Sequence, residues 1–157
     1  MAATSTYCDT SVFGGVFDEE FEGASRAFFD LVRRGRFEIL VSDISRAEIS
    51  SAPKQVRELF DGLLEYMRLV EADERILLLR DEYVSAGIVG RRSIDDAAHV
   101  AAATVAGADL IVSWNFRHMV HYEKIRLYNE VNARLRYGSI DIRSPLEVIE
   151  YADEEEF

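Results

Sequence analysis

The sequence predicts an α/β fold, a three-layer sandwich in which helices flank a mostly parallel sheet. Short β-prone segments alternate with helical stretches along the chain, and this alternation favours a parallel sheet. A length of 157 residues fits one compact domain. No internal repeat, low-complexity linker or second-domain boundary interrupts it. We therefore expect a single domain over residues 1–150, followed by an acidic tail over residues 151–157.

The first half of the chain contains two predicted strands, a brief extended piece and four predicted helices. The strands cover residues 6–8 and 37–41, the extended piece 69–71, and the helices 25–34, 44–49, 53–67 and 73–86. Gly14 and Gly15 predict a loop after the first strand. The helix opened by Pro53 carries one apolar stripe, formed by Val56, Leu59, Phe60, Leu63, Leu64 and Met67. This stripe packs inside the domain or forms the face of a homodimer.

The second half begins with an apolar helix that carries Asp95 and Asp96 in its first turn and ends at Gly107. A buried strand over residues 110–112 follows and leads to Asn115. We expect a further helix over 122–136, a last strand over 140–142 and a C-terminal helix that begins at Pro145. Ligands of open parallel sheets bind beyond the carboxyl ends of the strands, and Asn115 lies at such an end.

Composition restricts the class of protein. The net charge of −11, from 18 basic and 29 acidic residues, argues against a sequence-independent nucleic-acid binder with a basic surface, although a local basic patch is compatible with it. Apolar runs fall far short of the roughly 18 residues of a membrane span, and the first residues do not resemble a signal peptide. The single cysteine, Cys8, excludes an intramolecular disulfide and fits a reducing compartment. We expect a cytoplasmic protein without a membrane segment.

Four polar positions are candidates for a site at the edge of the sheet. Asp9 directly follows the first strand, and Asn115 follows a later one. Glu48 lies in the helix after the second strand, and Asp96, with Asp95 beside it, lies in the first turn of its helix. If the first and later strands are parallel neighbours, Asp9 and Asn115 emerge at one edge, and Glu48 and Asp96 can lean over it.

Each of these acids also has a structural explanation. Ser93 and Asp96 match the spacing of a capping box, and so do Ser45 and Glu48. Acids in a first helical turn interact favourably with the helix dipole, by about 0.3–1 kcal/mol each. Asp9 is also compatible with a polar turn after a strand. Spacing alone leaves both interpretations open.

Convergence of these acids would predict a metal site. Carboxylates at one sheet edge repel one another and raise each other's pKa values unless a cation neutralises them. Mg²⁺ and Mn²⁺ prefer such hard oxygen ligands. A bound ion of this kind generates a hydroxide nucleophile and stabilises the charge on a phosphoryl group.

The same residues resemble the motifs of the PIN domain. The matching segments are Tyr-Cys-Asp-Thr-Ser around Asp9, Ser-Asp-Ile-Ser-Arg-Ala-Glu ending at Glu48, Asp-Ala-Ala-His-Val-Ala-Ala-Ala from Asp96, and Leu-Ile-Val-Ser-Trp-Asn-Phe around Asn115. Their order and spacing over residues 7–114 are similar to those of the VapC-type toxin nucleases and related bacterial PIN proteins.

The resemblance implies a five-stranded parallel sheet and metal-dependent hydrolysis of RNA. It also suggests a toxin that a small antitoxin protein holds inactive. Asp9, Glu48 and Asp96 would hold Mg²⁺ or Mn²⁺, with Asp95 able to support or replace Asp96. Asn115 completes the catalytic set where many family members have a fourth acid. Hydroxyls of Ser11 or Ser113 would assist. The asparagine and the net charge also suggest an alternative, a PIN-fold RNA- or protein-binding module with little or no catalysis.

Other residues are weaker candidates. Several basic side chains near the proposed edge can meet RNA phosphates or simply form a solvated or salt-bridged surface: Arg91, Arg92, Arg117, Lys124 and Arg126. Trp114 fits a packing anchor better than a stacking platform. The three histidines and Cys8 match no compact zinc motif, and His99 is expected to be core-facing or hydrogen-bonded in its helix.

Overall fold

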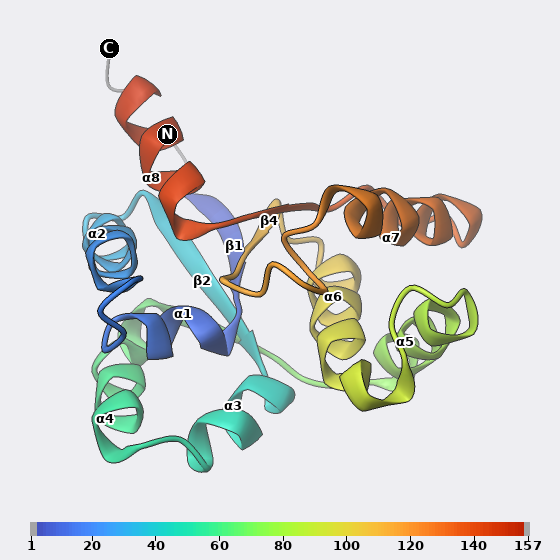
Figure 1. Ribbon diagram of the computed structural model, residues 1–157, viewed down its shortest axis with the longest axis horizontal. Coiled ribbons are helices and arrows are strands. Elements are labelled where there is room, and N and C mark those ends of the chain that lie inside the picture. Colours follow the sequence, from blue (N-terminus) through green and yellow to red (C-terminus); the bar gives the residue numbers. More distant parts are fainter. Residues whose placement is uncertain (1–2, 156–157) are drawn as a thin grey trace.

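The computed structural model describes residues 3–155 and contains a five-stranded sheet (Figure 1). The strand order is β3-β2-β1-β4-β5, and all pairings are parallel. The strands are β1 (Thr4–Cys8), β2 (Phe37–Ser42), β3 (Met67–Val70), β4 (Leu110–Val112) and β5 (Asp141–Arg143). This confirms the predicted parallel sheet and places the first strand beside the strand that leads to Asn115.

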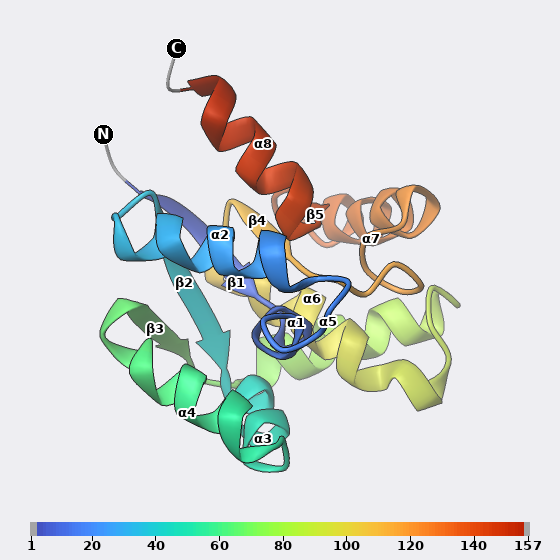
Figure 2. The ribbon, with the colours of Figure 1, turned by 60° about the vertical axis from the view of Figure 1, so that its left-hand side comes forward.

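Helices cover both faces of the sheet (Figures 1 and 2). One face packs against α1 (Thr10–Gly15), α2 (Glu22–Arg33), α4 (Lys54–Gly62) and α8 (Pro145–Glu155). The other packs against α5 (Glu74–Ser85), α6 (Ile94–Ala106) and α7 (Tyr122–Arg134). A further helix, α3 (Asp43–Ser50), follows β2 at the carboxyl end of that strand. The three-layer sandwich is therefore confirmed.

The two hydrophobic cores follow from the alternation of side chains along each strand. Successive residues of a strand point to opposite faces. Tyr7 and Ile111 accordingly pack in the core under α5, α6 and α7, whereas Cys8 and Val112 pack in the core under α1, α2, α4 and α8. Both faces of the central strands are buried, and the apolar run Ile39-Leu40-Val41 of β2 and the whole of β4 fit this environment, as is usual for parallel strands.

Two local predictions are wrong. The helix expected over residues 53–67 ends at Gly62, and a 3-10 turn (Leu64–Tyr66) leads directly into β3, because Met67 is needed to pair with Ile39 of β2. The loop expected at Gly14 and Gly15 is the end of α1. The helix α8 extends to Glu155, into the stretch expected as an acidic tail, and buries Ala152 in the core. No helix in the described part of the chain could cross a membrane, because none is both long and apolar enough.

Gly15 allows the chain to pass very close to Trp114. A Cβ atom at this position would lie 2.6 Å from Ser25 Oγ and 2.8 Å from Trp114 Nε1, whereas one at Gly14 would have no neighbour within 4 Å. We expect Gly15→Ala to lower the free energy of unfolding by about 1–3 kcal/mol through overpacking. Gly14→Ala, the matched control in the same helix, should leave stability unchanged or raise it by up to about 1 kcal/mol. Urea unfolding of both variants measures the difference, and equal stabilities would contradict the close approach.

Candidate metal centre

The four predicted site residues line one cleft at the carboxyl edge of the sheet. Asp9 and Asn115 follow the adjacent strands β1 and β4, and the Asp9 amide donates to the Val112 carbonyl at 3.0 Å. Glu48 reaches the cleft from α3 and Asp96 from α6, and the cleft has a volume of about 340 Å³. Asp95 is exposed and does not line it. Four elements, far apart in the sequence, therefore meet here.

Asp9 is held in one orientation by two serine hydroxyls. The residue is buried, with 5% of its surface exposed. Ser11 Oγ donates to Oδ2 at 2.7 Å and Ser113 Oγ donates to the same atom at 2.8 Å. Ser113 Oγ also accepts from the backbone amide of Asn115 at 2.9 Å. Because the same hydroxyl donates to Asp9, it connects the ends of β1 and β4. Both hydroxyls therefore orient the carboxylate of Asp9.

Glu48 is anchored by a chain of hydrogen bonds that runs into the core. Its Oε1 accepts from Thr10 Oγ1 at 3.2 Å and from His99 Nε2 at 2.6 Å. On the other side of the imidazole, Nδ1 is hydrogen-bonded to the Tyr7 hydroxyl at 2.6 Å, and that hydroxyl lies 2.7 Å from Ser42 Oγ. Because Tyr7 and His99 are buried, they restrict the side chain of Glu48 to this position.

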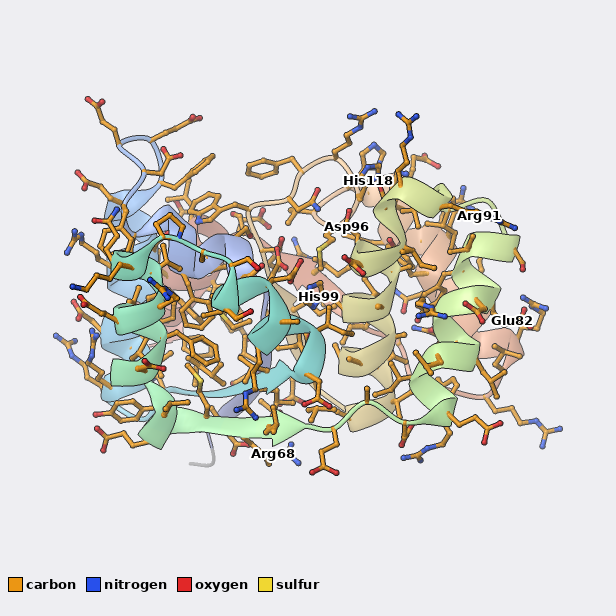
Figure 3. The ribbon with its side chains drawn as sticks, turned by 90° about the horizontal axis from the view of Figure 1, so that it is seen from below. Arg68, Glu82, Arg91, Asp96, His99 and His118 are labelled. Carbon is orange, nitrogen blue, oxygen red and sulfur yellow. The ribbon has the colours of Figure 1, made fainter. Side chains whose placement is uncertain are left out.

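His99 is buried and hydrogen-bonded, in agreement with the expectation, but its contact with Glu48 was not predicted. His99 follows Asp96 by three residues, so both side chains lie on the same side of α6 and point towards α3 (Figure 3). This spacing was the available signal. Cys8 is not part of the cluster of possible metal ligands that the described residues form, which consists of Asp9, Glu48 and His99. Burial, and then the charge of Asp9, raises the pKa of the Cys8 thiol.

The capping explanations of Glu48 and Asp96 are wrong. The N-cap of α3 is Ser42, whose side chain forms a capping box with Ser45, so Glu48 lies beyond the capped turn. Ser93 makes no capping hydrogen bond to α6, and its hydroxyl instead lies 3.1 Å from His118 Nε2. Neither acid is therefore accounted for by helix capping.

The electrostatics of the cleft favour a bound cation. Burial raises the pKa of Asp96, and the charge of Asp9 raises it further, while a hydrogen bond from the Asn115 side chain acts in the opposite direction. Burial also raises the pKa of Glu48, but the hydrogen bond and charge of His99 outweigh it, so the pKa of Glu48 is lowered. His99 therefore compensates the charge of Glu48, whereas the environment of Asp96 disfavours its charged form.

His99 is better suited to support Glu48 than to bind a metal. One ligand atom from each of Asp9, Glu48 and His99 lies within 4.8 Å of the others, and Asp96 is not part of this compact group. Burial lowers the pKa of His99, but Tyr7 and the carboxylates of Glu48 and Asp9 raise it well above the usual value. A protonated imidazole donates to Glu48 and has no lone pair for a metal.

The basic candidates divide into paired and unpaired side chains. Arg126 forms ion pairs with Glu123 and Glu130. Within residues 3–155, no ion pair is found for three exposed arginines, Arg91, Arg92 and Arg117. Trp114 packs as expected for an anchor, because its ring stacks on Phe21 at a centroid distance of 4.2 Å and its Nε1 donates to Ser25.

The fold is similar to a solved structure, although no family model and no curated protein matches the sequence. The crystal structure of VapBC2 from Rickettsia felis bound to a DNA fragment from their promoter contains a chain that aligns with a TM-score of 0.56. The alignment covers 90% of this chain and 98% of the other, with 14% identity. The fold is the VapC-like PIN fold. In this PIN fold, Asp9, Glu48, Asp96 and Asn115 share the cleft at the carboxyl edge of the sheet.

Proposed function

We propose that this protein is a metal-dependent ribonuclease that hydrolyses phosphodiester bonds. The supporting observation is the convergence of Asp9, Glu48 and Asp96, from three separate elements, on a single cleft beside Asn115. The PIN fold, with its likeness to a VapBC complex, suggests a nuclease of this type.

The residues of the cleft fit Mg²⁺ or Mn²⁺. Asp9, Glu48 and Asp96 would hold the ion through carboxylate oxygens, the ligands that both metals prefer. Burial, and then the charge of Asp9, raises the pKa of Asp96, so a divalent cation beside this carboxylate would stabilise its charged form. When bound, such an ion activates water and stabilises the charge on the phosphoryl group. Asn115 contributes an amide hydrogen bond to Asp96 and no charge.

A toxin-antitoxin role follows from the same likeness. The similar structure is that of a VapBC2 complex, bound to DNA from its promoter. We propose by analogy that this chain is the toxin and that a small antitoxin protein holds it inactive. The cytoplasmic location and the homodimer expected from the sequence belong to the same proposal.

Cleavage of RNA in the presence and absence of metal tests the proposed activity. We expect the purified protein to cleave single-stranded RNA with Mg²⁺ or Mn²⁺, and EDTA to abolish cleavage until excess metal restores it. Cleavage that persists in EDTA would contradict the proposed role of the carboxylates.

The second candidate is a PIN-fold binding or regulatory module, and Asn115 is the observation that favours it. Because its side chain is a neutral amide, the cleft has three acidic side chains and not four. Calorimetric titration with Mn²⁺ separates the two functions. A binding module should bind Mn²⁺ weakly or not at all and turn over no RNA at any metal concentration.

A further inference from the structure

An aromatic side chain is exposed directly beside the cleft. Phe116 follows Asn115, which lines the cleft, and is 49% exposed. Its ring meets the ring of Trp114 edge-on, with a centroid distance of 6.1 Å and an interplanar angle of 61°. The Phe116 ring is thus supported by Trp114, while about half of the residue remains open to solvent.

The support under Phe116 is rigid. Trp114 stacks on Phe21 with an interplanar angle of 23°, and its Nε1 donates to Ser25 Oγ at 2.8 Å. The close approach of Gly15 confines the same indole edge. Because the rings are already held in place, a base that stacks on Phe116 would lose little conformational freedom of the protein.

Unpaired positive charge lies next to this aromatic group. Arg117 immediately follows Phe116, and Lys124 Nζ lies 3.4 Å from His118 Nδ1 and donates to the Ile88 carbonyl. His118 and Arg91 lie at the same end of α6 as Asp96 (Figure 3). In a chain of net charge −11, cations that find no carboxylate among the described residues are available for an external anion.

We propose that the segment after β4 forms a subsite for an unpaired nucleotide of the RNA, in which Phe116 stacks on the base and Arg117, with Arg91, Arg92 and Lys124 nearby, contacts the backbone phosphates. Every base presents a π-face, so stacking on an aromatic ring tolerates any sequence. The bases of a duplex are stacked on one another, which restricts the subsite to single-stranded segments. This inference rests on the proposed ribonuclease function and names the form of RNA that the cleft accepts.

Binding by a catalytically silenced protein tests the stacking. In an Asp9→Asn background with Mg²⁺, the anisotropy of a labelled, unstructured RNA oligonucleotide gives Kd without cleavage. We expect Phe116→Ala to raise Kd about tenfold, which corresponds to about 1.4 kcal/mol. Phe116→Leu should bind as weakly as Phe116→Ala, because leucine keeps the apolar surface and loses the π-face. Phe116→Trp should retain binding.

The matched control is Tyr151→Ala, which removes an exposed aromatic ring from α8. This variant should bind RNA like the background protein. An equal Kd for Phe116→Ala and Tyr151→Ala would overturn the subsite, and so would full binding by Phe116→Leu or no measurable RNA binding by the background protein. The subsite would also be overturned if Phe116→Ala lost binding to an antitoxin-type protein partner while its binding to RNA stayed unchanged.

Salt dependence tests the phosphate contacts. The logarithm of the binding constant falls with the logarithm of salt concentration by about 0.7 for each phosphate contact of a single strand. Arg117→Gln should reduce this slope by about that amount. Arg126→Gln is the control, because Arg126 already pairs with Glu123 and Glu130, and its slope should be unchanged. Equal slopes for the two variants would overturn the phosphate contact.

Modified oligonucleotides identify the ligand. An abasic residue is placed at each position of the oligonucleotide in turn. At one position only, it should abolish the difference in Kd between the background protein and Phe116→Ala. A difference in Kd that survives at every position would overturn stacking. RNA cleavage by the wild-type protein is measured separately, so an intact subsite without cleavage would disprove the nuclease and not the subsite.

Discussion

Asp9→Asn is expected to lower the rate of metal-dependent RNA cleavage by about 1000-fold while the protein stays folded. Asparagine preserves the shape of the side chain and an oxygen for the hydroxyls of Ser11 and Ser113, but removes the charge from the centre of the cleft. Loss of several kcal/mol of electrostatic stabilisation corresponds to a rate factor of about 10³. Single-turnover cleavage with saturating Mn²⁺ measures the rate.

The metal-free stability of Asp9→Asn gives an independent readout. The charge of Asp9 contributes to the raised pKa of Asp96, so its removal relieves a repulsion. We therefore expect the melting temperature in EDTA to stay equal to that of the wild type or to rise. A large drop would show that a loss of activity reflects misfolding.

A pair of neighbouring aspartates provides the matched control. Asp96→Asn should abolish cleavage as Asp9→Asn does, because Asp96 lines the cleft. Asp95→Asn makes the same chemical change one residue away, on an exposed side chain outside the cleft, and should leave the rate within about twofold. Full activity of Asp96→Asn, or equal losses in the two variants, would contradict the assignment of Asp96 as the ligand.

Tyr7→Phe is expected to weaken Mn²⁺ binding about tenfold. The Tyr7 hydroxyl holds His99, and His99 holds Glu48, through hydrogen bonds of 2.6 Å each. Outer partners that orient a metal ligand typically contribute 10–100-fold to metal affinity, so loss of one hydroxyl should be felt at the metal. Isothermal titration with Mn²⁺ measures the effect directly and does not depend on RNA cleavage.

Tyr83→Phe is the matched control for this variant. Tyr83 is equally buried, and its hydroxyl is hydrogen-bonded to Asn132 and Thr104 away from the cleft. Both variants should lose about 1–3 kcal/mol of stability, because each leaves buried polar partners unsatisfied. Only Tyr7→Phe should change the Kd for Mn²⁺. Equal Mn²⁺ affinities in the two variants would show that the chain from Tyr7 to Glu48 is purely structural.

Much of the fold could be predicted because local sequence carries the necessary signals. A β-prone segment at β1 and apolar runs at β2 and β4 predicted strands of a parallel sheet, and the structure contains them. The stops at Gly35 and Gly107 were also predictable, since both residues adopt the positive φ angles that favour glycine. The stripe over residues 53–67 misled the helix prediction, because the pairing of Met67 with Ile39 outweighed local periodicity.

The residues that line the cleft were predicted, but most of their hydrogen-bond partners were not. Asp9, Glu48, Asp96 and Asn115 were identified from their positions after strands and in helices, supported by the resemblance to the PIN domain. The partners of these residues were not predicted, apart from the serine hydroxyls. Thr10 and His99 contact Glu48 only because α1, α3 and α6 pack together at one edge.

Local sequence was therefore sufficient to determine the type of most helices and strands, although not of α1, and the side chains that lie at their ends. Packing determined which of these ends meet. Thr6 pairs with Leu110 across more than a hundred residues, and this pairing of β1 with β4 brings Asp9 to Asn115. The rotation of α6 about its axis places Asp96 and His99, and not Asp95, towards the cleft. No local signal contains these two choices, because both depend on the burial of apolar surfaces contributed by distant parts of the chain.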